Sequence, residues 1–202
     1  MYIEEDFRPL GEVNIKPLAA YVNELSDTDW MQDSHRQQTY APHKQTQTIP
    51  LLFDEDLRHQ QATAYPHMTE LAPLLEPVYT AIAGYFASSV RQRALARRYG
   101  EPYFQRIILV RLAAGGCIDL HADHGFSLSR CHRIHVPILS HPQVLFQVGD
   151  SERCLLPGEI WEINNRRIHG VTNRGCAPRV HLILDYVMPG EKIFEPDAVL
   201  QA

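Results

Sequence analysis

The stretch EIWEINNRRIHGVTNRGCAPRVHLILDYV, residues 159–187, decides the fold. Two apolar segments, 159–163 and 180–187, lie at its ends, and the turn-forming pairs Asn164-Asn165 and Arg174-Gly175 lie between them. Short apolar runs separated by turns are typical of strands in a β-sandwich or barrel. The second half of the chain is therefore predicted to be built from strands.

The same pattern extends upstream, and a different one precedes it. Further strands are predicted at 104–112, 134–139 and 144–148. Before Pro102, apolar residues recur at helical spacing over 14–25, and one or two helices are predicted over 71–99. Because such helices need a sheet to bury their apolar faces, we expect one α+β domain over residues 1–202. Residues 1–100 would form a helical and loop region on the substrate side, and 101–190 the β core.

Composition excludes several classes of protein. The chain has 202 residues, of which 45% are hydrophobic and 21% charged, and its net charge is -5. This balance argues against nucleic-acid binding, and no run of about 18 apolar residues indicates a membrane span. The N-terminus is acidic, unlike a secretory signal.

The cysteines point to a reducing compartment. None of the four forms a C-x-x-C pair, so we expect reduced thiols and a cytoplasmic location; a zinc site built from them is the weaker alternative. They are Cys117, Cys131, Cys154 and Cys176.

Three residues in the second half of the chain are of the types that bind a metal ion together. His121-Ala122-Asp123 is a weak signal alone, since a surface turn also contains such residues, but His169 follows 48 residues later. Two histidines and one carboxylate on neighbouring strands make the facial triad of a non-haem Fe(II) oxygenase. Three ligands on one face leave positions for a chelating cosubstrate and O₂, whereas a fourth ligand would close the site.

Arg179 lies ten residues beyond His169, at the start of an apolar strand. An arginine buried there is costly unless it meets an anion, and its guanidinium matches a carboxylate with two parallel hydrogen bonds. The alternative partner is a structural acid such as Asp185.

These residues together resemble the Fe(II)/2-oxoglutarate-dependent oxygenases of double-stranded β-helix (jelly-roll, cupin-like) fold. Arg133-Ile134-His135-Val136-Pro137, Gly158-Glu159-Ile160-Trp161 and Arg179-Val180-His181-Leu182 are more closely similar to the aspartyl/asparaginyl β-hydroxylase family, including its bacterial proline cis-4-hydroxylases. The resemblance covers residues 104–187 well and the first hundred only loosely. Animal members have glycine at the position of Asp123, so this chain is nearer to the bacterial amino-acid hydroxylases.

The resemblance implies a role for each matching residue. His121, Asp123 and His169 would bind Fe(II), and Arg179 would bind the distal carboxylate of 2-oxoglutarate. Arg133 and His135 would reach the other carboxylate or the substrate, from one face of a strand whose other face carries Ile134 and Val136. Arg130-Cys131-His132 repeats the Arg-X-His pattern; we prefer the second copy because an apolar strand follows it directly. Arg111 is either a structural ion pair or a site residue.

The implied activity is hydroxylation of an amino-acid side chain, free or in a peptide, with decarboxylation of 2-oxoglutarate to succinate and CO₂. Two alternatives remain: a cupin-fold metal enzyme that does not use 2-oxoglutarate, and a catalytically silent binding module. The polar segment 31–53 is interpreted as a lid and substrate wall, since loops on a rigid barrel carry specificity, with a solvated loop as the alternative for any single residue. Its candidate residues are His43, Gln45, Thr46, Gln47 and Thr48.

Overall fold

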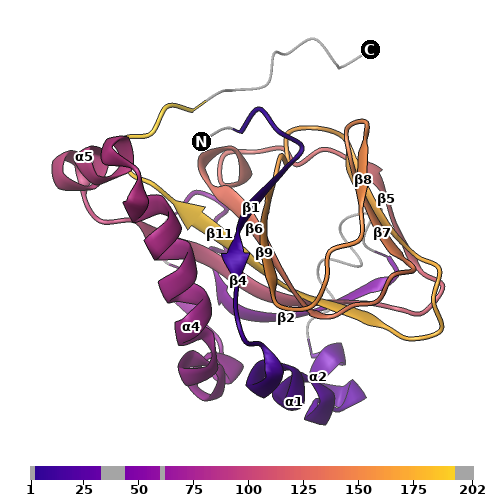
Figure 1. The fold of residues 1–202 in the computed structure, drawn as a ribbon. Coiled ribbons are helices and arrows are strands. Elements are labelled where there is room, and N and C mark those ends of the chain that lie inside the picture. The colour runs from indigo at the N-terminus through magenta and orange to yellow at the C-terminus, as the bar shows by residue number, and fades with distance from the viewer. Residues whose placement is uncertain (1–2, 33–43, 60–61, 194–202) are drawn as a thin grey trace.

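Two antiparallel sheets face each other to form a barrel (Figure 1). The computed structural model describes residues 3–32, 44–59 and 62–193. Within these residues the larger sheet has seven strands in the order β1-β9-β6-β11-β4-β2-β3, and the smaller has four in the order β5-β10-β7-β8. The strands are β1 (Phe7–Glu12), β2 (Thr46–Phe53), β3 (Thr63–Ala64), β4 (Tyr103–Leu112), β5 (Cys117–His121), β6 (His132–Leu139), β7 (Val144–Val148), β8 (Ser151–Arg153), β9 (Glu159–Ile163), β10 (His169–Asn173) and β11 (Arg179–Val187). Neighbours in each sheet come from distant parts of the chain, which confirms the jelly-roll prediction.

The larger sheet has an apolar outer face, and its inner face carries buried arginines and histidines beside a small apolar cluster. In β6, Ile134 and Val136 join the outer core, whereas Arg133 and His135 point into the barrel and take part in a different set of contacts. Strict alternation along a strand produces this division, and it confirms the predicted faces of this segment.

Helices cover the outer face. They are α1 (Lys16–Glu24), α2 (Asp27–Met31), α4 (Pro66–Ser88) and α5 (Val90–Tyr99). Every third or fourth residue of α4 is buried against the sheet, at Leu71, Leu75, Val78, Ile82 and Phe86. The helical region predicted at 71–99 is two helices, and the first begins earlier, at Pro66, because a proline suits the first turn. The predicted buttress is confirmed.

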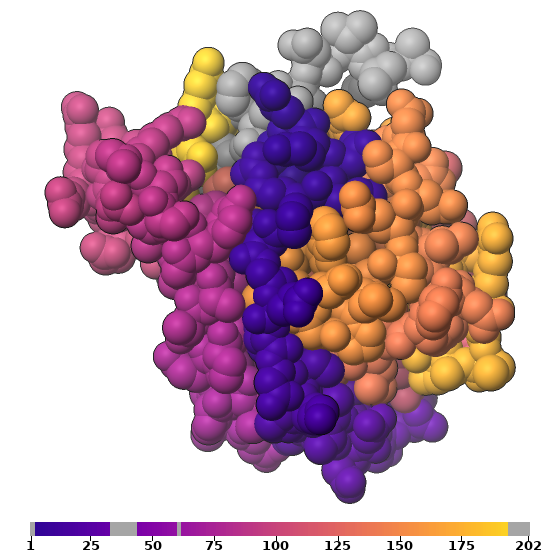
Figure 2. Space-filling model, in the orientation of Figure 1, coloured from indigo at the N-terminus to yellow at the C-terminus, as the bar shows by residue number. Residues whose placement is uncertain are grey.

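Residues 1–100, predicted to form a helical and loop region, also contribute strands to the larger sheet. β1 and β2 belong to the larger sheet and pair with β9 and β4. In Figure 2 the N-terminal segment (indigo) runs between the helices (magenta) and the barrel strands (orange). β1 escaped notice because its Pro9 and Gly11 flank a bulge that breaks the period-2 pattern.

The second part of the segment 31–53, predicted to form a lid and substrate wall, is a strand and not a loop. Thr46, Gln47 and Thr48 belong to β2, and the threonines are buried. Gln45 precedes the strand and its side-chain oxygen accepts a hydrogen bond from the backbone N–H of Cys117. His43 lies outside the described residues.

Two further findings concern the state of the cysteines and the possibility of a membrane-spanning helix. All four cysteines are free, and the cluster of possible metal ligands found in the described residues contains none of them. In the same part of the chain, no helix has the length and apolar character needed to cross a membrane.

Candidate metal centre

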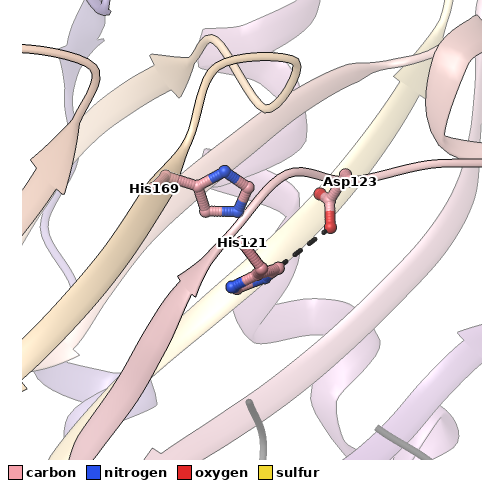
Figure 3. Close-up of side chains that lie close together, drawn as sticks. All are labelled: His121, Asp123 and His169. Carbon is pink, nitrogen blue, oxygen red and sulfur yellow. Dashed lines mark ion pairs between the residues drawn. The ribbon is translucent and has the colours of Figure 1, made fainter. Parts of the chain in front are cut away.

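His121, Asp123 and His169 come together at one end of the smaller sheet (Figure 3). His121 ends β5 and His169 begins β10, and these two residues are directly paired across the strands. The ligand atoms of all three side chains lie within 4.8 Å of one another. His121 Nε2 is 3.9 Å from a carboxylate oxygen of Asp123, and the imidazole centroids are 4.4 Å apart. The residues predicted as a facial triad therefore form a compact group.

Backbone carbonyls orient both imidazoles. Nδ1 of His121 lies 2.7 Å from the carbonyl oxygen of Asp119, and Nδ1 of His169 lies 2.9 Å from that of Arg167. A carbonyl can only accept, so each Nδ1 carries the proton and donates, which makes Nε2 the atom available as a metal ligand. Metal-binding histidines in proteins are commonly held in this way.

Several neighbouring side chains hold Asp123 as a carboxylate. Burial acts to raise its pKa, but the Arg133 guanidinium, 3.0 Å away, and the two nearby histidines bring the pKa well below its usual range. The Asn165 amide also donates to it at 3.3 Å. Burial lowers the pKa of His169. The ionised carboxylate and neutral imidazole are the forms that bind a metal.

Arg133 connects this centre to a buried chain of charges. Its guanidinium donates two hydrogen bonds to Asp185, at 3.0 and 2.8 Å, in addition to its contact with Asp123. Asp185 also pairs with Arg106, which pairs with Asp54. Asp185 was considered as a partner of Arg179; it pairs instead with the other two arginines. The predicted contact of Arg133 with cosubstrate or substrate remains a prediction.

Inside the barrel, Arg179 and two histidines form a buried group of donors. Arg179 is 1% exposed, and its Nη2 donates to Nδ1 of His181 at 2.6 Å. His181 must then carry its proton on Nε2. That nitrogen, together with Nε and Nη1 of Arg179, has no hydrogen-bond partner. His135 lies 3.5 Å from His181, between nitrogen atoms, and its Nε2 is also without a partner.

The charge of Arg179 is not compensated within the described chain. Burial alone lowers the pKa of its guanidinium to about 9. The pKa of His135 is lowered well below its ordinary value by burial and by the charges of Arg179 and Arg133, with a further contribution from His169. The imidazole of His135 is therefore neutral beside the buried arginine. Buried donors without acceptors are expected to meet an anion.

The other candidate residues have structural contacts elsewhere. His132 faces the outside of the sheet, where its two nitrogens contact Glu162 and Glu191. Arg130 stacks on Phe126. The second Arg-X-His copy, with Arg133 and His135, is thus the one that faces the centre.

Arg111 also points outward. Its guanidinium pairs with Asp27 of α2 at 2.8 Å and donates to Gln47 of β2. Of the two roles considered for Arg111, this contact corresponds to the structural ion pair.

Sequence reasoning missed two supports of Asp123. Asp185 fixes Arg133, and Asn165 holds the carboxylate with its side chain and accepts from the Asp123 backbone N–H at 2.9 Å. Asn165 was interpreted first as a turn former. Its position four residues before His169 was the signal available, but the pairing of the two loops was not visible in the sequence.

Comparison with known proteins agrees with this site. Residues 90–189, about half of the chain and all of the centre, match the family model described as Aspartyl/Asparaginyl beta-hydroxylase. No curated protein matches the chain.

Solved structures share the fold at low identity. One is a viral collagen prolyl hydroxylase from Paramecium bursaria Chlorella virus-1 (6% identity, 91% of this chain and 96% of that one, TM-score 0.57). A second is an oxidoreductase of the 2OG-Fe(II) oxygenase family from Burkholderia pseudomallei (15%, 88% and 91%, 0.52). A third is a Pseudomonas putida prolyl-4-hydroxylase (13%, 93% and 95%, 0.51).

A jelly-roll barrel with two histidines and one aspartate at its mouth defines the class of the protein, a 2-oxoglutarate-dependent oxygenase. Within that class, the chain belongs to the aspartyl/asparaginyl β-hydroxylase family.

Proposed function

We propose that this protein hydroxylates an amino-acid side chain, free or within a peptide, and couples this to decarboxylation of 2-oxoglutarate. In the balanced reaction, one oxygen atom of O₂ enters the C–H bond and the other enters succinate, with release of CO₂. The observation that carries the proposal is the buried Arg179, whose guanidinium has donors without acceptors behind a complete set of metal ligands.

The residues present fit both groups that the reaction needs. His121, Asp123 and His169 would hold Fe(II), which suits neutral imidazoles and a carboxylate. Arg179 and His181 would bind the distal carboxylate of 2-oxoglutarate, since their unpaired N–H groups match its acceptor oxygens. Bound iron and 2-oxoglutarate, with O₂, supply the oxidising power for an unactivated C–H bond.

The chain itself would position and shield the reactants. Arg133 and Asn165 keep Asp123 ionised and fix its direction, and the two backbone carbonyls do the same for the histidines. Phe146 packs edge-on against His135, and Ile183 and Val110 belong to an apolar cluster farther along the barrel. Such a lining would exclude the water that quenches a reactive oxidant.

The proposal can be tested by product analysis. The purified protein with Fe(II) and 2-oxoglutarate should give a weak visible absorption band without O₂. With O₂ it should form succinate and add about 16 Da, one oxygen atom, to a member of a panel of amino acids and lysate peptides. Absence of both the band and succinate would overturn it. If Arg179→Ala kept full activity, the alternative of a metal enzyme independent of 2-oxoglutarate would be correct.

We further propose a cytoplasmic setting, which the four free cysteines support because thiols stay reduced there. We also propose a small amino acid or a peptide as the substrate of the enzyme.

A further inference from the structure

We propose that a cavity between β2, α2 and the start of α4 binds the organic substrate through a protonated amine, so that the substrate carries a free amino group. This inference rests on the proposed function, which makes the ligand of the cavity the substrate of the enzyme. The binding of an amine in the cavity can be measured without turnover.

The cavity has the size of a small-molecule site. Its volume is about 510 Å³, within the range usual for such sites. Ile49, Pro50 and Phe53 of β2 supply apolar wall, and Pro66 closes it from the start of α4. A ligand with a compact hydrocarbon body fits this lining.

The charged groups of the lining are acidic. Asp29 and Glu55 contribute carboxylates; the lining also contains His67, whose Nδ1 lies 2.9 Å from the Tyr21 hydroxyl, and within the described residues no lysine or arginine. Hydrogen bonds from the hydroxyl and the backbone N–H of Ser26 lower the pKa of Asp29, so it is ionised at neutral pH. The ring of Tyr65 also borders the space, and aromatic faces attract cations; the Phe53 ring already has the Arg106 guanidinium 4.5 Å from its centre. The field in the cavity therefore favours a cation.

A buried hydroxyl gives independent evidence of a ligand. Thr48 lines the cavity, is 3% exposed, and its Oγ1 has no hydrogen-bond partner. Buried polar groups are nearly always paired, and the exceptions call for an explanation. An ammonium group that donates to Oγ1 would satisfy it, because a hydroxyl offers acceptor lone pairs.

The sheet register places the cavity beside the proposed cosubstrate site. Thr48 is paired with Val110 of β4, and Val110 with His181 of β11. Paired residues point to the same face, so Thr48 and His181 share the inner face of the larger sheet. At about 4.8 Å between neighbouring strands, their backbones are roughly 10 Å apart. The side chain of Thr48 therefore lies on the same sheet face as the proposed cosubstrate residue His181, two strands away.

The binding test uses a cation and a neutral molecule of equal size. The full chain, loaded with Mn(II) and 2-oxoglutarate without O₂, is titrated with n-butylammonium and with 1-butanol while amide NMR signals are recorded. We expect n-butylammonium to bind more tightly and to shift the signals of Thr48 and Phe53. Thr48→Val and Glu55→Gln should each weaken binding by about three- to tenfold. Glu12→Gln, which removes an exposed carboxylate outside the cavity, should leave it unchanged.

Equal binding of the alcohol, no binding of the cation, or unchanged affinity in both cavity variants would overturn the inference. Should one cavity variant fail to fold, the other still decides. Succinate formation by the wild-type protein is measured in parallel. Succinate without selective amine binding refutes the cavity assignment alone, and amine binding without succinate refutes the proposed function alone. The catalytic consequence is checked with free amino acids and their N-acetyl derivatives, of which only the free forms should be hydroxylated.

Discussion

Arg179 has a buried positive charge and only a neutral imidazole as hydrogen-bond partner in the described chain. Replacing it by methionine keeps much of its volume and removes the charge. We expect the KM for 2-oxoglutarate to rise by at least about 30-fold, because loss of one partner of a buried charged pair is costly. Mn(II) affinity should not change. Arg174→Met, at an exposed position nearby, is the control.

The same substitution makes an opposite prediction for stability. Without ligand, Arg179→Met should leave the free energy of unfolding unchanged or raise it by about 1–2 kcal/mol, because an uncompensated buried charge is removed. Urea unfolding of both proteins, free of metal and 2-oxoglutarate, measures this. A clear loss of stability would mean that the guanidinium has a structural partner.

Residue chemistry explains how much of the site the sequence could predict. His121, Asp123 and His169 could be found because their types and order define a metal chemistry by themselves. The roles of Asp185 and Asn165 could not, because an aspartate in an apolar strand and an asparagine in a turn have many explanations. Their contacts depend on which strands pair, and the sequence does not state that.

At the scale of elements, the centre depends on close pairing of β5 and β10. Gly170 follows His169, and a Cβ atom there would lie 2.8 Å from the backbone carbonyl of Ile118, which cannot move freely. Gly170→Ala should therefore push the strands apart and weaken Mn(II) binding by about tenfold or more, as supporting positions of metal sites do. Gly84→Ala, in α4 where nothing lies within 4 Å, should bind Mn(II) normally and gain about 0.5–1 kcal/mol of stability. Equal Mn(II) affinity in both variants would contradict this.

His132 joins β6 to β9 and to the segment after β11. Burial opposes its protonation, but Glu162 and Glu191 raise its pKa to about 9, above the ordinary value of 6.5. Because the folded state holds the proton more tightly, this stabilisation is complete below about pH 6.5 and is lost as the pH rises through about 9. We expect the unfolding free energy to fall by about 1–3 kcal/mol over that interval.

His132→Gln should flatten this dependence, whereas His124→Gln, at an exposed position, should preserve it. Urea titrations at several pH values between these limits provide the measurement. A wild-type curve that rises with pH over the interval would show that the imidazole is neutral in the folded protein.

The strand β2 illustrates which elements escape sequence analysis. Its first three residues, Thr46, Gln47 and Thr48, are polar and continue the polar segment that precedes them. The threonines at the start of the strand were therefore assigned to a loop. They are buried because they face the inside of the barrel, where other polar groups gather, while Ile49 and Leu51 pack under the helices.

For the whole molecule, the apolar outer face of the large sheet explains why the helices are part of the same body as the barrel. One core of buried residues includes Leu18 of α1, Ile82 of α4 and Leu182 of β11. The sequence predicted this arrangement because amphipathic helices require a sheet. It did not predict the N-terminal strands, since their places in the sheet are set by partners that are far away in the chain.

Mn(II) and then 2-oxoglutarate should each raise the thermal stability of the whole molecule. Mn(II), used in place of Fe(II) to prevent turnover, brings a cation to three clustered ligands, and 2-oxoglutarate then compensates Arg179. A ligand at 100 times its Kd adds about 2.7 kcal/mol, and for a chain of this length each kcal/mol raises Tm by about 2–4 °C. We therefore expect 2-oxoglutarate to raise the Tm of the Mn(II) protein by about 5–10 °C. In Arg179→Met the increment from Mn(II) should remain and that from 2-oxoglutarate should disappear. An equal increment from 2-oxoglutarate in both proteins would place its carboxylate elsewhere, because the buried charge would then contribute nothing to its binding.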